Sequence, residues 1–197
     1  MRLLLASGSA RRAEILDTLG IEFDIQPADI DESARAGEAP DALCRRLATQ
    51  KAETVHASAP DATIIGADTL VAFGGEALGK PRDAEHGRSM LAAMSGTTHR
   101  VHTAMTVIAP PGTVHEHLST SVVTLRALAA EEITAYWATG EPIDKAGGYA
   151  IQGIGGAFVE HLDGSASAVA GLDCCQIVAL LRAAGVAILG QPTDAAD

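Results

Sequence analysis

Apolar and polar positions alternate along this chain with two periods, which predicts a succession of strands and helices. Continuous apolar runs at residues 3–6 and 63–67 are typical of buried strands, and the second run ends at Asp68. Alternation with a period of two predicts further strands at residues 21–25, 70–73, 76–78, 99–109, 114–125 and 158–162, and a short strand ending at Val169. Apolar positions at helical spacing predict helices at residues 10–19, 41–58, 83–94, 129–138 and 173–184.

Glycine- and proline-rich turns separate these elements, and neither a linker nor an internal repeat interrupts them. Residues 27–40 are acidic and irregular, and residues 140–158 form a long glycine-rich loop. Strands and helices that alternate in this way indicate an α/β fold. We therefore expect one domain at residues 1–190, followed by a C-terminal tail at residues 191–197.

The composition is that of a protein with an ordinary hydrophobic core. Apolar residues make up 47% of the 197 residues and charged residues 20%, which argues against disorder. No apolar run approaches the roughly 20 residues that span a membrane. The short apolar run at the start is followed directly by charged, helix-like sequence, which is not typical of a signal peptide. We therefore expect a cytoplasmic protein without a membrane segment.

The chain is strongly acidic, with a net charge of −11, which argues against a general nucleic-acid-binding surface. Its three lysines are Lys51, Lys80 and Lys145, and each lies beside a glycine-rich loop, an acidic cluster or a strand end. An acidic protein that binds a polyanion has to gather its cations locally and needs metal ions to offset its carboxylates. Compositional bias alone also explains a low lysine content.

The cysteines and histidines do not form a recognisable metal or disulfide framework. Of three cysteines, Cys174 and Cys175 are adjacent, and the chain has no Cys-x-x-Cys motif. His99 and His102 lie in strand-like sequence that alternates, so we expect them on a solvated face and not in a metal site.

A serine-glycine turn between the first strand and the first helix is a candidate phosphate site. Ser7-Gly8-Ser9 precedes the helix, and Arg11 and Arg12 fall in its first turn. A helix N-terminus presents unpaired N–H groups and a partial positive charge, which suits an anion. The alternative is a serine cap with two solvated arginines. The chain contains no Walker A motif.

Carboxylates in two segments are candidates for metal binding or for activating water. Asp68 follows small residues where a buried strand ends, a place where ligand crevices form in α/β sheets. Asp29, Asp31 and Glu32 form an oxygen-rich cluster that suits hard cations such as Mg²⁺ or Mn²⁺. A turn aspartate and an ordinary acidic surface loop are the alternatives.

Two further segments carry polar groups of ambiguous role. Lys51 lies at the edge of an apolar helix face, where a lysine either extends to water or reaches into a cleft. The loop at residues 144–153 has glycines that allow close approach to a ligand, and Gln152 offers an amide suited to a base edge. A purely structural glycine loop is the alternative, and no Rossmann fingerprint is present, which disfavours a dinucleotide oxidoreductase.

Several segments in order along the chain resemble the Maf family. They are ASGSARRAEIL, IIGADTLV, GKPRDAEHGRSMLAAMSG and EPIDKAGGYAIQGIGGAFVEHLDGS, and the resemblance runs from Leu3 to about Leu181. It implies a Maf/ITPase-like fold: an elongated mixed sheet with flanking helices and two lobes around a central cleft, which in this family is often a homodimer. It also implies metal-dependent hydrolysis of a nucleoside triphosphate between its α and β phosphates.

The resemblance assigns roles to individual residues of this chain. Asp68 corresponds to the proposed proton acceptor, and Glu32 to an acidic position that would hold the divalent metal together with Asp68. Three positions correspond to those that determine specificity: Arg11, Thr69 and Gln152. Four correspond to phosphate-contacting positions: Ser7, Arg12, Lys51 and Lys80. The motifs IGADT and DKAGxYxIQG are similar to the branch that acts on dTTP and UTP, whereas the 7-methyl-GTP branch tends to lack IQG.

The chain also departs from the family pattern. Ala10 stands where the family usually has a proline, and residues 164–173 lack the usual aromatic residue and the GLP motif. This second departure bears on substrate range and cleft packing. A nucleotide-binding regulator of cell division is the alternative function, because the family was once described as septum-formation inhibitors.

Overall fold

The computed structural model describes residues 2–188 and 190. Its strands are β1 (Leu3–Leu5), β2 (Asp24–Ile25), β3 (Thr63–Phe73), β4 (Glu76–Leu78), β5 (Thr98–Ala109), β6 (Thr113–Leu125) and β7 (Val159–Asp163). Its α-helices are α1 (Ala10–Thr18), α2 (Pro40–Ser58), α3 (Ala84–Met94), α4 (Ala130–Ala138), α5 (Ala166–Ala170) and α6 (Cys174–Ala183). Three short 3₁₀ helices are η1 (Glu141–Asp144), η2 (Ala146–Gly148) and η3 (Ile154–Phe158).

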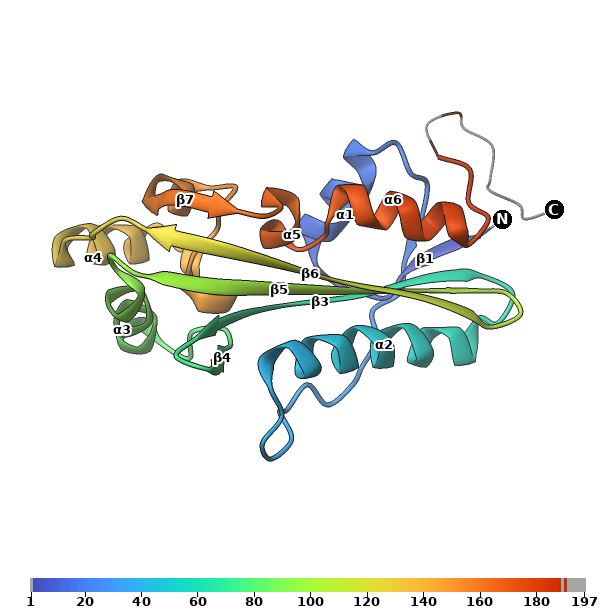
Figure 1. The fold of residues 1–197 in the computed structure, drawn as a ribbon, viewed down its shortest axis with the longest axis horizontal. Coiled ribbons are helices and arrows are strands. Elements are labelled where there is room, and N and C mark those ends of the chain that lie inside the picture. Colours follow the sequence, from blue (N-terminus) through green and yellow to red (C-terminus); the bar gives the residue numbers. More distant parts are fainter. Residues whose placement is uncertain (1, 189, 191–197) are drawn as a thin grey trace.

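The strands of this part of the chain form one mixed sheet of seven, which confirms the predicted α/β class. The order is β2-β1-β3-β5-β6-β7, and β4 pairs with β3. β1 is parallel to β2 and β3, whereas the other pairs are antiparallel. The long strands β3, β5 and β6 run the length of the elongated molecule (Figure 1).

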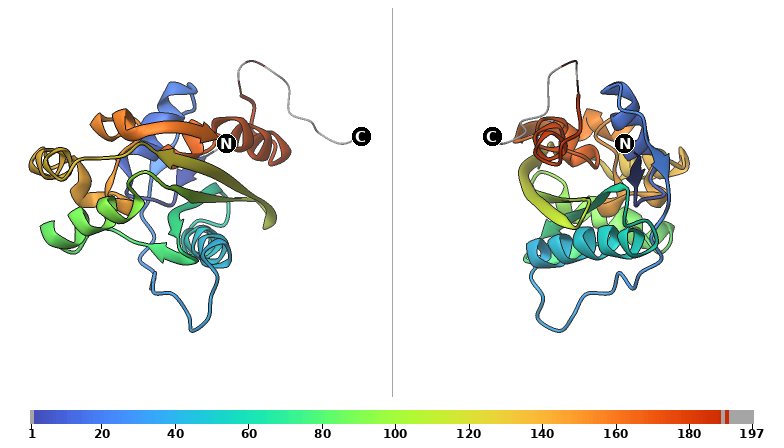
Figure 2. Two further views of the ribbon diagram at one scale, coloured as in Figure 1. Left: turned by 60° about the vertical axis from the view of Figure 1, so that its left-hand side comes forward. Right: turned by 90° about the vertical axis from the view of Figure 1, so that its right-hand side faces the viewer.

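Helices cover both faces of one end of the sheet, because its strands there are apolar on both sides. α1 and α6 pack on one face through a cluster that includes Leu5, Leu16 and Ile177. α2 packs on the other face through Val55 and neighbouring apolar residues. The right-hand view of Figure 2 shows α2 and α6 on opposite sides of the sheet.

A second large hydrophobic cluster lies at the other end of the long strands, where α3 and α4 pack (Figure 1). It includes Leu91, Val123 and Tyr136. We propose that the two ends are the two lobes of a single domain over residues 1–190. The predicted tail at residues 191–197 lies outside the described residues.

Three local predictions were wrong. β3 does not end at Asp68 but continues to Phe73, because β5 pairs with it along this whole stretch. The short strand predicted to end at Val169 is the helix α5, which Ser165 caps by accepting a hydrogen bond from the Ala168 N–H. His99 and His102 are 2% and 8% exposed instead of solvated, since the sheet buries His99 beside Tyr149 and His102 beside Thr120.

No helix within residues 2–188 and 190 combines the length and the apolar character needed to cross a membrane.

Candidate active site

The candidate site lies where one edge of β3 loses its neighbouring strand. β1 pairs with β3 only as far as Ile65, and β4 pairs with it only from Val71 onward. Asp68 and Thr69 fall in this gap within the described residues. Because successive side chains of a strand point to opposite faces, Asp68 faces α2 and Thr69 faces α1. The gap therefore exposes both residues to one space between the helices.

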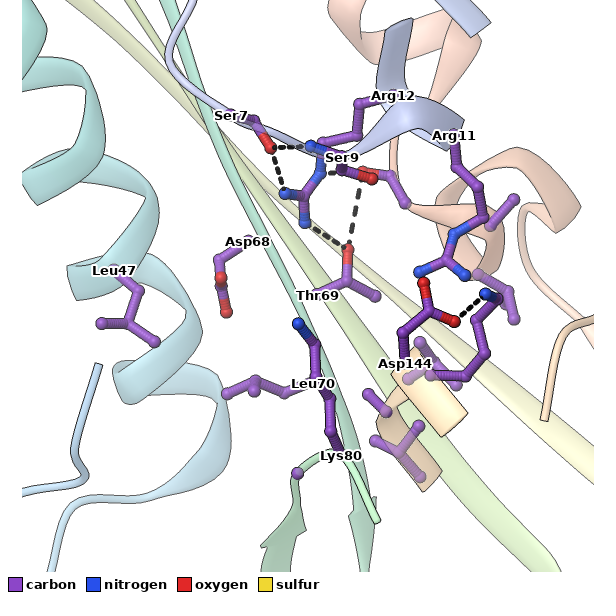
Figure 3. A pocket seen from close by; sticks show the side chains of 18 of the residues that line it. Ser7, Ser9, Arg11, Arg12, Leu47, Asp68, Thr69, Leu70, Lys80 and Asp144 are labelled. Carbon is purple, nitrogen blue, oxygen red and sulfur yellow. Dashed lines mark hydrogen bonds and ion pairs between the residues drawn. The ribbon is translucent and has the colours of Figure 1, made fainter. Parts of the chain in front are cut away.

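That space is a cavity of about 1040 Å³. All nine residues predicted for the site line it: Ser7, Arg11, Arg12, Glu32, Lys51, Asp68, Thr69, Lys80 and Gln152. They come from the turn before α1, from α1, α2, β3 and from three loops. Figure 3 shows several of them converging on the cavity. Asp29 and Asp31, the other members of the predicted acidic cluster, are not among the lining residues that the structure describes.

Lys51 reaches from α2 into the cavity and joins the two predicted metal-binding carboxylates. Its Nζ atom lies 2.7 Å from Asp68 Oδ1 and 2.6 Å from Glu32 Oε1. Lys51 and Asp68 are both buried, whereas the Glu32 side chain is 59% exposed. Of the two alternatives that the sequence left open for Lys51, the structure therefore selects the cleft.

The surroundings of Asp68 raise the pKa of its carboxyl group and so favour proton uptake. Burial raises the pKa of its carboxyl group, and the charges of Lys51 and Arg12 oppose that rise. Its Oδ2 atom is buried and has no hydrogen-bond partner among the described residues. Burial likewise disfavours the charged form of Glu32, but the hydrogen bond and charge of Lys51 outweigh burial and lower the pKa of Glu32. The two carboxylates thus have different proton affinities.

Cys44 lies beneath Asp68 and was not singled out from the sequence. Its Sγ atom donates to the backbone oxygens of Asp68 and His102, at 3.3 and 3.4 Å. Burial and the charge of Asp68 raise the pKa of the Cys44 thiol to about 12, so it stays neutral. No sequence signal marks this residue, because its role depends on α2 crossing β3 at this point.

Arg12 is a buried cation that three segments hold in place, and not a solvated arginine. It donates to Ser7 Oγ at 2.9 Å, to the Gly171 carbonyl at 3.0 Å and to Thr69 Oγ1 at 3.3 Å. Ser7 Oγ also accepts from the Ser9 N–H, which orders the turn before α1. Gly171 ends α5, so the segment that departs from the family pattern supplies one of the contacts to Arg12.

Arg11, Lys80 and Lys145 are the remaining cations that line the cavity. Figure 3 shows the Arg11 side chain pointing toward Asp144, which forms an ion pair with Lys145. The hydrogen bond from Lys145 and the charges of Lys145 and Arg11 lower the pKa of Asp144. Lys80 is exposed and follows β4. The sequence indicated Asp144 only as the first residue of a glycine-rich loop. Its interaction with Arg11 was not predictable, because the two residues are far apart along the chain.

The site offers two carboxylates for a divalent metal. Glu32 and Asp68 both line the cavity, and Asp68 Oδ2 is an unpaired buried oxygen. In the part of the chain that the structure describes, no group of three or more His, Cys, Asp or Glu residues could hold a metal ion. Mg²⁺ is commonly held by one or two carboxylates together with substrate phosphates, so these two residues fit such an ion.

The fold and the site together define an α/β protein whose cleft suits a polyanionic ligand, with cations from four chain segments around two carboxylates. The model of the family described as Maf-like protein matches residues 2–184. This chain belongs to the Maf family, as its sequence motifs predicted.

Curated relatives match this chain over nearly its whole length. A protein of Hahella chejuensis named dTTP/UTP pyrophosphatase is 46% identical over 190 residues, which cover 95% of this chain and 94% of the relative. A protein of Myxococcus xanthus with the same name is 49% identical over 185 residues, covering 93% of each. Among solved structures, the Staphylococcus aureus Ham1 protein aligns with a TM-score of 0.46 and 14% identity over 64% of this chain and 72% of that one; a likeness of this size carries no argument.

Proposed function

We propose that this protein hydrolyses dTTP and UTP to the nucleoside monophosphate and pyrophosphate. One observation carries the proposal: the buried, partly unpaired carboxylate of Asp68 opens into the same cavity as the cations Arg11, Arg12, Lys51 and Lys80. This combination suits an attack by water on a phosphate chain. The names of relatives that are 45–49% identical over nearly the whole chain support the substrate class.

The triphosphate binds at the turn before α1. Ser7 lies beside the N-terminus of α1, whose free N–H groups favour an anion. Arg12 and Lys51 bring buried positive charge, and Lys80 brings an exposed one from the other side of the cavity. Fixed charges in a partly buried site stabilise the negative charge that develops at the reacting phosphorus.

Asp68 accepts a proton from the attacking water. Its Oδ2 atom is free of protein contacts among the described residues, and burial raises the pKa of the carboxyl group toward the range in which a base works at neutral pH. The hydrogen bond from Lys51 fixes Oδ1 and thereby orients Oδ2. The attacking water thus contacts a general base, Asp68, that is already positioned next to the phosphate-binding cations.

Asp68 and Glu32 would hold a divalent cation, Mg²⁺ or Mn²⁺. Such an ion supplies charge neutralisation for the phosphate oxygens. Lys51 neutralises the same two carboxylates through its ion pairs.

The base binds at the end of the cavity formed by Arg11, Thr69 and Gln152. Gln152 is exposed, and its amide offers both a donor and an acceptor, as the edge of uracil or thymine requires. Thr69 Oγ1 lies 3.1 Å from Thr103 Oγ1 and accepts from Arg12, so its position is fixed from two sides. These three residues therefore recognise the nucleobase, while the phosphates lie nearer to Arg12.

The test is a panel of canonical nucleoside triphosphates with Mg²⁺ or Mn²⁺, in which pyrophosphate, monophosphate and inorganic phosphate are scored separately. We expect pyrophosphate and monophosphate in equal amounts, with dTTP and UTP turned over fastest. Inorganic phosphate as the direct product would contradict cleavage between the α and β phosphates. Faster turnover of the purine nucleotides would contradict the substrate class.

A further inference from the structure

A carboxylate outside the cavity holds the loop that carries Gln152. Glu141, at the start of η1, accepts hydrogen bonds with both of its side-chain oxygens. Oε2 accepts from the Ile154 N–H at 2.9 Å, and Oε1 accepts from the Gly155 N–H at 2.9 Å. Both of these amides follow Gln152 in the chain, so Glu141 fixes the C-terminal end of the loop.

Tyr136 fixes the other end of the same loop. Its hydroxyl accepts from the Ala150 N–H at 3.1 Å and donates to Glu141 Oε1 at 2.7 Å. The Tyr136 ring, on α4, is buried and packs edge-on against Phe158, with 4.8 Å between the ring centroids. This packing fixes the position of the Tyr136 hydroxyl. The two ends of the segment at residues 150–155 are therefore tied to one network, and Gln152 lies between them.

Two glycines of the loop are required by this network and not by backbone conformation. Neither Gly153 nor Gly155 has a positive φ angle. A Cβ atom at Gly155 would lie 2.6 Å from the Tyr136 hydroxyl, and one at Gly153 would overlap the Glu141 carboxylate. The loop backbone thus lies against Glu141 and Tyr136 too closely for any side chain, which leaves it little freedom to shift.

Glu141 is ionised and is not itself part of the cavity wall. Burial disfavours its charge, but the hydrogen bonds from the Gly155 N–H, Tyr136 and the Ile154 N–H outweigh burial and lower the pKa of Glu141. It is not among the cavity-lining residues that the structure describes, whereas Gln152 and Ile151 are. The hydrogen bonds of Glu141 therefore act on a bound nucleotide through the loop, while its charge also acts on the cavity-lining Lys145.

We propose that Glu141 is a positioning residue that sets nucleobase selectivity, because it fixes the segment at residues 150–155, which carries Gln152, from outside the cavity. The inference rests on the proposed function, since it assigns the base to the part of the cavity that Gln152 lines. An amide that recognises a base has to be held in one place, because a mobile one loses entropy when it binds and accepts competing bases. Both ends of the loop are held through the one carboxylate.

The test compares Glu141→Gln with the matched control Glu132→Gln. Glu132 lies in the same lobe, outside the cavity, and its carboxylate likewise accepts from a backbone N–H, that of Ala129, and from the side chain of Arg126. In Glu141→Gln one of the two backbone N–H groups faces an amide NH₂ and loses its acceptor. We expect KM for dTTP to rise about tenfold with kcat changed by less than about twofold, and the kcat/KM preference for dTTP over dATP to fall about tenfold.

Glu132→Gln is expected to leave KM, kcat and the preference for dTTP unchanged. Hydrogen exchange at Ile154 and Gly155 should accelerate in Glu141→Gln and not in the control. Tyr136→Phe removes only the hydroxyl and should shift selectivity in the same direction; this variant provides the test if Glu141→Gln does not fold. Equal losses on dTTP and dATP, a loss in kcat alone, or the same change in the control would overturn the inference.

Calorimetric titration with the α,β-imido analogues of dUTP and dATP separates this inference from the proposed hydrolysis. The wild-type protein could bind the dUTP analogue preferentially and yet release no pyrophosphate from dTTP or UTP. The proposed function would then be wrong, but the ratio of the two dissociation constants, compared between the wild type and Glu141→Gln, would still report the role of Glu141. If the wild-type protein shows no preference between the analogues, the inference is wrong even where hydrolysis is observed.

Discussion

Lys51 Nζ lies 2.7 Å from Asp68 Oδ1, and each side chain is 9% exposed. The pair links α2 to the middle of β3 at the point where β3 has neither β1 nor β4 beside it. A buried carboxylate without this partner would carry an uncompensated charge. The activity and the stability of this protein are therefore coupled at one contact.

Replacing Lys51 by methionine is expected to destabilise the protein in a pH-dependent way. Without the ammonium, burial raises the pKa of Asp68 further. As the pH rises, the unfolded state therefore releases this proton first, while the folded state still keeps it. Stability is then retained below the usual carboxyl pKa and lost as the pH rises through the raised value. We expect a loss of about 3 kcal/mol at about pH 8 and a much smaller one at about pH 4, measured by urea unfolding.

The double variant Lys51→Met/Asp68→Asn checks this explanation. It should regain most of the stability lost at high pH, because the buried carboxylate without its lysine partner is gone. A pH-independent loss in Lys51→Met, equal in the double variant, would attribute the effect to packing instead.

Arg11 and Arg12 are adjacent, but their replacement by lysine should have different effects. Arg12→Lys loses the hydrogen bonds to Ser7 and Gly171, so we expect about 2 kcal/mol lower stability together with a strong loss of kcat/KM. Arg11 shares none of these contacts and points toward Asp144, so Arg11→Lys should keep stability within about 0.5 kcal/mol and change base selectivity. Thermal unfolding and nucleotide kinetics on both variants measure the contrast, and equal stability losses would contradict it.

His99 should make the fold sensitive to mild acid. Burial lowers the pKa of His99 to about 4, from an ordinary value of 6.5. Between these two values the unfolded state binds a proton that the folded state does not, so stability rises with pH across this window. We expect the free energy of unfolding to fall by about 2 kcal/mol from about pH 7.5 to about pH 5 because of this residue.

His99→Gln should lack this part of the pH dependence, measured by urea unfolding at both pH values. The exposed His161 provides the control variant His161→Gln, which should keep the wild-type pH dependence. An unchanged pH dependence in His99→Gln would mean that other groups cause it.

Gly66 sets the separation between β3 and α2. A Cβ atom there would lie 2.7 Å from the Ala52 backbone nitrogen and 2.8 Å from its Cβ atom, and it would overlap the Ala48 carbonyl. Gly66→Ala should therefore push α2 outward, cost about 2–3 kcal/mol and lower kcat/KM by separating Lys51 from Asp68. Gly79→Ala, whose added Cβ meets nothing within 4 Å, should keep wild-type stability in the same thermal unfolding assay.

The sequence predicted the long local elements well, because their signals are local. β5 and β6 differ by a single residue at their starts from the predicted ranges, and so does α3, whose N-cap is Asp83. For the short segment that ends at Val169, the alternation of its residues predicted a strand, which is wrong. Its serine cap and alanine content favour a helix once Gly171 ends it.

The site residues were predictable as a set only through the family resemblance. The residues alone left Lys51 and Asp68 ambiguous, because their burial depends on α2 crossing β3, a contact between distant segments. Gly171 and Cys44 carry no motif signal, since one acts through its carbonyl and the other through burial beneath Asp68. Glu141 lies in one of the segments that resemble the Maf family, but only the folded loop shows which N–H groups its two side-chain oxygens bind.

The most direct test of the central claim is hydrolysis of dTTP in ¹⁸O-labelled water by the wild-type protein, Asp68→Asn and the exposed control Asp61→Asn. We predict that the wild type and Asp61→Asn place the label in the monophosphate or in pyrophosphate, the two products of cleavage between the α and β phosphates, and not in inorganic phosphate. Asp68→Asn should keep the wild-type near-UV circular dichroism and lose at least about a hundredfold in rate. Label in inorganic phosphate, or near-normal turnover by Asp68→Asn, would contradict the account.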